Sequence, residues 1–517
     1  MRFLLLDFAI PNYRFAHSFY LTGSTDALIN EKFQRATGWF VAAINAEIPI
    51  TASVAVPWVL VILFVGAFYF TLYFRGINFR SFGTSIRIVK GDYDHLENGE
   101  NEGEENKNPS EGEVSHFQAL TTALSATVGL GNIGGVAIAL SIGGAGATFW
   151  MIIIGLLGMA SKFVECTLGV AYREVNEKGV VFGGPMYYLS KGLKDKGLSG
   201  LGKVLAVLFA IMCVGGSFGG GNMFQANQAF KLFENVTGGE HSLFHEKGWL
   251  FGVIMAVLVG IVIIGGIKKI AKVTDKIVPA MVVTYILAIL VVVGTNYRLI
   301  PDAFGQIWSG AFSPSGIAGG FMGVLVQGFR RGAFSNEAGI GSAAIAHAAV
   351  KTSYPASEGL VALLEPFIDT VLVCTMTALA LIITGQLTVG ATVSPEQGVL
   401  LTSGALESTI SWFPYVLTIA VILFAFSSMI SWSYYGYQAW TYLFGKNEVL
   451  GYTYKFLFCG FVIIGAAASL DAVIGFSDAM VFAMMVPNMI GLFLLTPVVA
   501  KELKKYYKAI QNKHRVR

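Results

Sequence analysis

The sequence predicts an all-α polytopic membrane protein, and its composition and hydropathy pattern both support this class. Of the 517 residues, 54% are hydrophobic and only 13% are charged, and the mean hydropathy is +0.64. Soluble chains of this length divide into domains joined by polar linkers. Here, apolar runs of about 20 residues, the length that crosses a bilayer, recur from residue 56 to residue 500. The four cysteines lie in separate apolar runs and predict neither a disulfide framework nor a metal site.

Eleven membrane-spanning segments are expected. We place them near 54–74, 117–140, 145–170, 201–230, 248–267, 277–295, 315–349, 357–385, 411–444, 455–475 and 479–500. Several of these segments are longer than a straight span requires, so they are expected to tilt, to kink or to contain a break.

Lysine and arginine predict the orientation of these segments. They gather in alternate connections and at the C-terminal end, whereas the opposite connections hold only Lys231, Lys247 and Arg298. The C-terminus is therefore expected on the cytoplasmic side of the cell membrane, and the N-terminus outside. Residues 1–53 are treated as an extracytoplasmic extension. The acidic stretch 91–113 is expected to be a solvated cytoplasmic linker, with a regulatory or partner-binding role as the alternative.

The stretch "VGLGNIGG", residues 128–135, has the G-x-G-x-x-G spacing of a dinucleotide-binding loop. That motif needs a preceding strand and an acidic residue about 20 positions later. The preceding residues favour a helix, and the next acidic residue, Glu165, lies inside another apolar run. Glycines flanked by Thr127 and Asn132 at bilayer depth instead predict an unwound helix, which is tolerated only where it lines a cavity or is buried in protein.

A second break is predicted in the segment 315–349. Its middle, "QGFRRGAFSNEAGIGS", places glycines, two arginines, an asparagine and a glutamate within one apolar setting. If the segment that carries the first break counts as helix 1, this segment is helix 6 of ten. Broken helices in corresponding positions of two repeats are typical of secondary transporters. We therefore expect a LeuT-like 5+5 inverted repeat with one extra N-terminal helix.

The domain boundaries follow from this count. Residues 1–53 form the N-terminal extension, and the extra helix with the acidic loop covers 54–116. The first five-helix repeat spans 117–295, the second spans 296–500, and residues 501–517 form a basic cytoplasmic tail.

Several longer motifs occur in a consistent order: "SHFQALTTALSATVGLGNIGGVA", "GGPMYYL", "GNMFQANQ", "RRGAFSNEAGIGSA", "FIDTVLVCT" and "SWSYYG". With them the chain resembles the alanine or glycine:cation symporter family, a branch of the amino acid–polyamine–organocation superfamily, over roughly residues 55–500. Leu130 stands where that family commonly has threonine. The resemblance implies sodium-coupled uptake of a small neutral amino acid, such as alanine or glycine, across the cytoplasmic membrane.

A set of residues near the two breaks is expected to bind the amino acid. The backbone N–H groups of Leu130, Gly131 and Asn132 are expected to hold its carboxylate, because glycine lets a ligand approach the main chain. Carbonyls at a break in Gly328–Ser335 are expected to hold its ammonium. A bulky Trp432 is expected to shorten the pocket, and Phe334 is either a lid or ordinary core. The full set is Thr127, Gly129, Leu130, Gly131, Asn132, Gln225, Gly332, Phe334, Ser428 and Trp432.

Two cation sites are expected, because sodium prefers hard oxygen ligands. The fold that the chain resembles implies one site at the helix 1 carbonyls near Ser125 and Val128 together with Ser427 and Ser428. These serines could instead bond to their own helix. The intramembrane carboxylate of Asp369 predicts a second site, or a proton-sensitive group, with Thr127, Asn132 and Thr370. The structural alternative is that Asp369 pairs with Arg330 or Arg331.

Other functional classes are less well supported. Proton-coupled symport is the nearest alternative, because Asp369 could titrate. A channel is disfavoured by asymmetric polar clusters. An intramembrane enzyme is a remote alternative, because the histidines lack H-E-x-x-H spacing. No cofactor other than the coupling ion and no nucleic-acid partner is expected, and the lipid bilayer is the expected surroundings.

Overall fold

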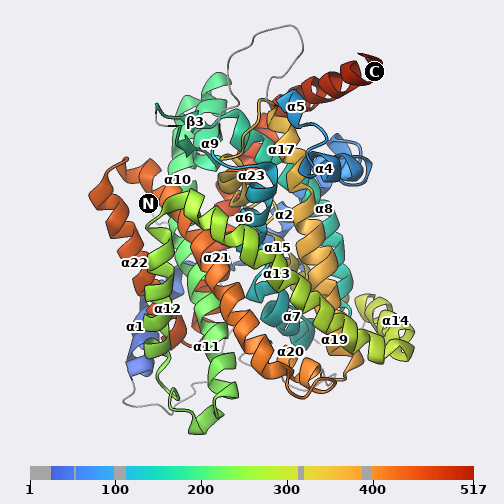
Figure 1. Cartoon of the computed structure of the whole chain (residues 1–517), viewed down its shortest axis with the longest axis vertical. Helices are drawn as coiled ribbons and strands as arrows, with labels where there is room; N and C mark the ends of the chain where they lie inside the picture. Colours follow the sequence, from blue (N-terminus) through green and yellow to red (C-terminus); the bar gives the residue numbers. More distant parts are fainter. Residues whose placement is uncertain are drawn as a thin grey trace, which may run out of the picture.

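The computed structural model of the chain describes residues 25–51, 54–97, 112–177, 179–312, 320–386 and 398–516. These residues are almost entirely helical, and Figure 1 shows long helices packed side by side along one axis. The all-α class is therefore confirmed. Most of the predicted acidic linker lies outside the described residues.

The N-terminal region contains a helix, a small hairpin and a second long helix. Its elements are α1 (Thr25–Ile44), β1 (Glu47–Thr51), β2 (Val54–Pro57), α2 (Trp58–Tyr73), α3 (Ile77–Arg80), α4 (Phe82–Val89) and α5 (Asp94–Glu97). The strands β1 and β2 pair antiparallel.

The first half of the core begins with a broken helix. Its elements are α6 (His116–Thr127), η1 (Gly131–Gly135), α7 (Val136–Gly143), α8 (Ala147–Ala171), β3 (Glu174–Val175), β4 (Val181–Phe182), α9 (Pro185–Asp195), α10 (Ser199–Phe218), η2 (Gly219–Met223), α11 (Phe224–Val236), η3 (Gly239–His241), α12 (Gly248–Ile263) and α13 (Gly266–Thr295). The start of α6 is fixed by a capping box between Ser115 and Gln118.

The second half also begins near a broken helix. Its elements are η4 (Tyr297–Leu299), α14 (Ile300–Ala311), α15 (Gly320–Asn336), α16 (Ala343–His347), α17 (Pro355–Ala362), α18 (Leu364–Pro366), η5 (Phe367–Cys374), α19 (Thr375–Ile383), α20 (Gly398–Glu407), α21 (Phe413–Phe444), α22 (Glu448–Ala467) and α23 (Leu470–Val516). Breaks near the start of both halves agree with the LeuT-like order of helices.

By length and composition, seven helical stretches of the described residues can cross a membrane, and the bent pair α6 and η1–α7 brings the number to eight if it counts as one broken span. The shorter apolar helices α2 and α12 correspond to two more predicted segments. The predicted total of eleven spans stays a prediction, because α15 and α16 are separated and neither reaches the length of a span.

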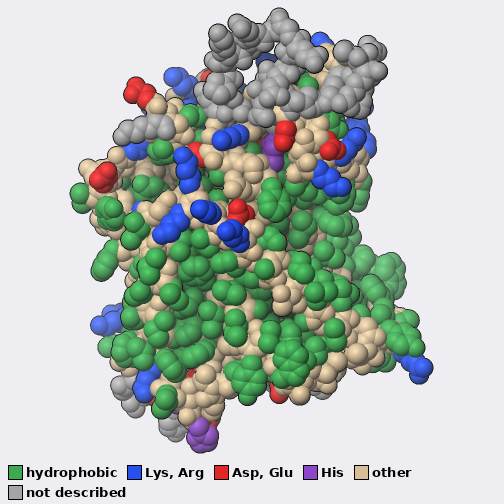
Figure 2. All heavy atoms as spheres, viewed as in Figure 1, with side chains coloured by type: hydrophobic (Ala, Val, Ile, Leu, Met, Phe, Trp, Pro, Cys, Tyr) green, Lys and Arg blue, Asp and Glu red, His purple; other side chains and the backbone are tan. Residues whose placement is uncertain are grey.

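Two helices extend beyond the predicted membrane segments. The stretch Lys268–Lys276, expected as a connection, belongs to α13, and the tail expected from residue 501 continues α23 as helix to Val516. Lysines favour helix about as well as leucine does, so a basic stretch can extend a helix beyond the apolar layer. Figure 2 shows this layer as a broad hydrophobic band, with Lys and Arg gathered toward the end of the molecule where α9 and α17 lie in Figure 1.

Candidate functional site

The first predicted break is present. α6 ends at Thr127, Val128 is extended with φ −74° and ψ 94°, and the helix resumes at Gly131 at an angle of 52°. The amide N–H of Gly129 donates to Oδ1 of Asn132 at 2.8 Å, and that of Leu130 donates to Oε1 of Gln225 at 3.2 Å. Two main-chain donors freed by the break thus point at side-chain oxygens.

The predicted carboxylate-binding amides differ in their surroundings. The Asn132 amide donates to the Gly129 carbonyl at 3.2 Å, so it is taken up by the turn. The Leu130 amide faces Gln225, which a substrate carboxylate could replace. Asn222 and Gln228 tie helices together: Asn222 donates to the carbonyl of Phe458 at 2.7 Å, and Gln228 accepts from the amide of Val399 at 3.3 Å.

The second break lies elsewhere than predicted. Residues 328–335 are helical within α15, and the chain unwinds over 337–342. A Cβ on Gly328 would lie 2.5 Å from the Ala147 carbonyl, and one on Gly332 would lie 2.5 Å from Cγ2 of Ile154. These two glycines therefore allow α15 to approach α8 closely. Gly332 faces α8, and its expected place in the substrate site is wrong.

The unwound residues have the positive φ angles that mark the break. Glu337, Gly339 and Gly341 have φ of 55°, 83° and 97°. This conformation costs little for glycine, and Gly339 and Gly341 supply two of the three positions. The carbonyl of Gly339 accepts a hydrogen bond from Nδ2 of Asn488 at 2.9 Å, so α23 holds the unwound segment.

Asp369 lies at the meeting point of three interrupted helices. It is fully buried in η5. Its Oδ1 accepts from Nδ2 of Asn132 at 2.6 Å, and its Oδ2 accepts from the hydroxyls of Ser335 at 2.8 Å and Thr370 at 2.6 Å. Thr370 also accepts from Nδ2 of Asn336 at 3.1 Å. The structure thus brings together Asn132, Asp369 and Thr370 as predicted, and it adds Ser335.

The expected alternative, an ion pair between Asp369 and Arg330 or Arg331, is wrong. Both arginines contact Asp478 of α23, Arg331 directly through Nη2 and Arg330 through Nε at 3.4 Å. Arg330 also donates to Asn45. Glu337 accepts from the hydroxyl of Ser342.

The serines of the other predicted cation site join α6 to α21. The hydroxyl of Ser428 donates to the carbonyl of Ser125 at 2.9 Å, and the hydroxyl of Ser125 donates to the carbonyl of Ser427 at 2.8 Å. The Ser427 hydroxyl donates to the carbonyl of Phe424 in its own helix at 3.0 Å. Hydroxyl and carbonyl oxygens of the predicted kind therefore meet here. Val128, whose carbonyl was predicted to join them, is buried and follows directly on α6.

A small cavity lies between these elements. Its lining residues are Ala126, Thr127, Gly131, Gly220, Gln225, Phe334, Ser335, Glu337, Trp432 and Val481. Five of the predicted substrate residues line it, namely Thr127, Gly131, Gln225, Phe334 and Trp432. Ser428 is not one of the lining residues; it lies next to Gly129, where a Cβ would lie 2.6 Å from Oγ of Ser428.

Trp432 and Phe334 form apolar walls of this cavity. Trp432 is 1% exposed, and it packs so closely on Gly221 that a Cβ there would overlap the indole. Phe334 packs edge-on against Phe224 with ring centroids 5.7 Å apart, and the Arg331 guanidinium lies 5.4 Å from its centroid. Phe334 thus both lines the cavity and separates it from the Arg331–Asp478 pair.

Three π-helical segments surround the site: Gly131–Gly135, Gly219–Met223 and Phe367–Cys374. Such segments are rare and occur frequently at functional sites, because the wider turn leaves backbone groups without their usual partners. Sequence reasoning missed the second and third. The run "GGGN" at 219–222 was an available signal, because consecutive glycines weaken a helix.

A second buried polar cluster lies outside this cavity. Lys162 and Glu165 are fully buried inside α8. The Lys162 ammonium lies 3.8 Å from Oε1 of Glu165 and 3.2 Å from Oε2 of Glu365. The carboxylate of Glu365, which lies on another helix, makes burial of the lysine tolerable.

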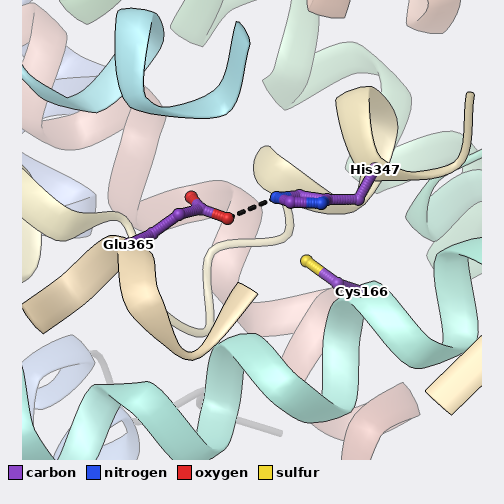
Figure 3. A group of neighbouring side chains, drawn as sticks. All are labelled: Cys166, His347 and Glu365. Atoms are coloured by element: carbon purple, nitrogen blue, oxygen red, sulfur yellow. Dashed lines mark hydrogen bonds and ion pairs between the residues drawn. The ribbon is translucent and has the colours of Figure 1, made fainter. Parts of the chain in front are cut away.

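Cys166, His347 and Glu365 have ligand atoms within 4.8 Å of one another, and Figure 3 shows the thiol beside the imidazole, which bonds to Glu365. Such a trio could hold a metal ion. However, both ring nitrogens of His347 bond to carboxylates, of Glu358 and Glu365, and the Lys162 ammonium already lies at Glu365. A metal would have to displace these partners, so the group is better described as part of an ion-pair network.

The chain matches the sodium:alanine symporter family over residues 41–517. It belongs to this family. It is 43% identical to the sodium/alanine symporter AgcS of Methanococcus maripaludis over 78% of the chain and 86% of that protein. It is 34% identical to the probable sodium/glutamine symporter GlnT of Bacillus subtilis over 86% of the chain and 87% of that protein.

Among solved structures, the chain is similar to MhsT in complex with L-phenylalanine, with 15% identity, a TM-score of 0.49, and coverage of 76% of the chain and 99% of that structure. Its relatives are transporters, so this family member is a multi-pass membrane transporter and not an enzyme. The amino acids named for these two relatives are alanine and glutamine.

Proposed function

We propose that this transporter couples sodium entry to uptake of a small neutral amino acid, such as alanine or glycine, across the cytoplasmic membrane, with its C-terminus in the cytoplasm. The observation that carries the proposal is the environment of Asp369. It is a buried carboxylate beside a cavity between two broken helices, and the described residues place only neutral donors on its oxygens.

An uncompensated carboxylate at this depth favours a bound cation. An isolated buried charge is costly unless it is paired or binds a metal ion, and hydroxyl, amide and carboxylate oxygens suit a hard cation. Asn132 Oδ1, Ser335 Oγ and Thr370 Oγ1 stand near Asp369 to complete such a site, and Thr127 lines the cavity alongside. The oxygens of Ser125, Val128, Ser427 and Ser428 form the second candidate site.

The cavity suits an amino acid with a short side chain. The freed amide of Leu130 provides a donor for its carboxylate, which would displace Gln225 from that position. Glu337, Thr127 and Ser335 line the cavity, and their oxygens would serve as acceptors for its ammonium group. Phe334, Trp432 and Val481 leave an apolar wall for a side chain of the size of methyl.

Proton-coupled symport is the second candidate, and the same carboxylate favours it. If Asp369 binds a proton in place of sodium, its three neutral partners would still satisfy the neutral carboxyl group. The two candidates therefore differ in which cation neutralises Asp369, and they predict different driving gradients.

Uptake of radiolabelled alanine into proteoliposomes tests the proposal. An inward sodium gradient and an inward proton gradient are applied separately, with protein-free liposomes as the control. Uptake with sodium at equal pH on both sides supports the proposal. Uptake driven only by protons supports the second candidate, and no uptake with either gradient refutes the choice of substrate.

A further inference from the structure

The six side chains that we call the His347 cluster form a buried network separate from the transport cavity. They are His116 of α6, Lys162 and Glu165 of α8, His347 of α16, Glu358 of α17 and Glu365 of α18, and all are less than 9% exposed. None of them lines the cavity. The proposed transport mechanism uses none of them. Burial of six ionisable groups costs free energy unless they pair with one another or form hydrogen bonds.

The contacts of His347 require a proton at each ring nitrogen. Nδ1 bonds to Oε1 of Glu358, and Nε2 bonds to Oε1 of Glu365. Ionised carboxylates only accept hydrogen bonds, and a neutral imidazole carries a single N–H. Two ionised glutamates and a neutral histidine would therefore supply one proton for two contacts. The cluster holds one more proton, and we assign it to His347 as an imidazolium, because a carboxylate lies at each of its ring nitrogens.

The remaining contacts continue the alternation of charge. Glu365 also faces the Lys162 ammonium at 3.2 Å, and Lys162 faces Glu165 at 3.8 Å. Glu358 bonds to Nδ1 of His116 through its other oxygen. With both histidines protonated, three acidic and three basic groups balance. Loss of the shared proton would leave a net negative charge in a low-dielectric interior, where such an imbalance is unfavourable.

The cluster joins the ends of both broken helices. His116 is the first residue of α6, which leads to the first break, and His347 is the last residue of α16, which follows the second break. Both are tied to the same residue, Glu358 of α17. In Figures 1 and 2, α17 lies toward the end of the molecule at which Lys and Arg gather, which the charge pattern predicts to be cytoplasmic.

We propose that the His347 cluster is a proton-binding site that holds this end of the two broken helices together and releases a proton when that end opens. The proposal rests on the proposed function in one respect, namely that the protein opens alternately to the two sides. It adds a second ionisable element to the transporter, distinct from Asp369.

Groups on every element packed around His347 enter this balance. They are His116 of α6, Lys162, Glu165 and Cys166 of α8, Glu358 and Glu365 of α17 and α18, and Tyr435 of α21. The Glu165 carboxylate also accepts from Asn488 at 3.3 Å, which links the cluster to α23 and to the unwound residue Gly339.

The sign of the pH effect follows from this linkage. In the closed form two carboxylates hold the proton, whereas opening admits water, which replaces the carboxylates as partner and lets the proton leave. Protons therefore favour the closed form, and opening becomes easier as the pH rises. One linked proton can change the equilibrium by at most about tenfold per pH unit.

Nitrogen NMR of the purified full-length protein, labelled with ¹⁵N-histidine, tests the proton directly. An ordinary histidine titrates near pH 6.5 and is almost wholly neutral at pH 8.5. We expect at least one histidine to keep both ring nitrogens protonated at pH 8.5, and we expect His347→Gln to lose one such signal. The proposal is overturned if no histidine is doubly protonated at pH 8.5, or if His347→Gln loses none of these signals.

The link to opening is tested by alanine uptake at equal sodium gradients, with the pH raised from 6.5 to 8.5 on both sides. Wild type is expected to become several-fold faster, and Glu365→Gln, which keeps the shape but removes one carboxylate, is expected to show a flatter profile. His245→Gln is the matched control, because this exposed loop histidine pairs with a single carboxylate, that of Glu234. If the rate of alanine uptake depends on pH in the same way in wild type and in Glu365→Gln, the link between the His347 cluster and opening is refuted.

Failure of the proposed substrate and failure of the proposed proton-binding site can be distinguished. If the wild-type protein does not transport alanine at any pH, the choice of substrate fails, and the NMR spectrum alone decides the proton-binding site. If His347→Gln does not fold, the Glu365→Gln spectrum decides it, because loss of one carboxylate partner must shift the signal of the doubly protonated histidine. An unchanged signal in that variant would refute the assignment.

Discussion

At the scale of single residues, the carboxylate of Asp369 accepts hydrogen bonds from Asn132, Ser335 and Thr370, none of which carries a charge. Its nearest candidate partners in the sequence, Arg330 and Arg331, are engaged with Asp478 instead. The negative charge at this point is thus available for an ion. The sequence predicted Asp369, Asn132 and Thr370 from their depth in apolar runs, but the arginine pairing could not be predicted because Asp478 lies far along the chain.

Replacement of Asp369 by asparagine is expected to raise the sodium concentration for half-maximal alanine uptake by about tenfold or more. Asparagine keeps the size of the side chain but removes the charge, and a hydrogen bond to a charged group contributes about 1.5–3 kcal/mol. Sodium titration of uptake measures the effect. Asp302→Asn, in the exposed start of α14, is the control and should behave as wild type. An unchanged sodium requirement in Asp369→Asn would count against this cation site.

Replacement of Trp432 by leucine is expected to widen the cavity and to shift preference toward larger amino acids. A difference of one methylene in a pocket is worth about 1–3 kcal/mol, so the ratio of leucine to alanine uptake should rise roughly tenfold. Competition of unlabelled amino acids against labelled alanine measures it. Trp412→Leu, at a tryptophan that is 61% exposed, should leave the ratio unchanged, and an equal shift there would contradict the role of Trp432.

At the scale of elements, glycines serve two different purposes in the second broken helix. Gly328 and Gly332 let α15 approach α8, and Gly339 and Gly341 allow the positive φ angles at which the chain unwinds. The sequence predicted that a break exists in this segment but put it at 328–335 instead of 337–342. The sequence cannot separate these purposes, because a glycine required for close packing and a glycine required for a positive φ angle look identical in it.

Gly341→Ala is expected to destabilise the protein and to lower transport. Its φ of 97° disfavours a side chain, and a Cβ would lie 2.6 Å from Cγ of Pro185. Strain of this kind costs about 1–3 kcal/mol, so the thermal midpoint should fall by several degrees. The matched control is Gly294→Ala in α13, where a Cβ meets nothing within 4 Å. Equal midpoints for the two variants would show that the break tolerates a side chain.

At the scale of the whole molecule, the N-terminal helix α1 is docked onto the membrane helices. Oδ1 of Asn30 accepts hydrogen bonds from the amide and the hydroxyl of Ser469, at 3.1 and 2.9 Å, and Oδ2 of Asp26 accepts from the amide of Gly248 at 3.0 Å. Phe33 packs edge-on against Phe476 with ring centroids 5.1 Å apart. Ile29, Phe33, Phe40 and Ile44 recur at the spacing of one helix face, which predicts an amphipathic helix. Its partners could not be predicted, because Gly248, Ser469 and Phe476 lie far along the chain.

Asn30→Ala is expected to loosen this docking without abolishing transport. Two hydrogen bonds of about 1 kcal/mol each are lost between α1 and the turn before α23. Hydrogen exchange of the α1 amides should become faster, while the rate of alanine uptake stays within about twofold of wild type. Gln34→Ala, on an exposed position of the same helix, is the control. Unchanged exchange in Asn30→Ala would mean that α1 is held by other contacts.

Coupling between sodium and alanine is reciprocal. The most direct measurement is therefore uptake of radioactive sodium into proteoliposomes, driven only by an inward alanine gradient, with equal sodium and equal pH on both sides. Alanine is expected to drive sodium inward although the sodium concentration is equal on both sides. Asp369→Asn is expected to abolish this movement. Alanine entry without accompanying sodium would contradict the proposed coupling.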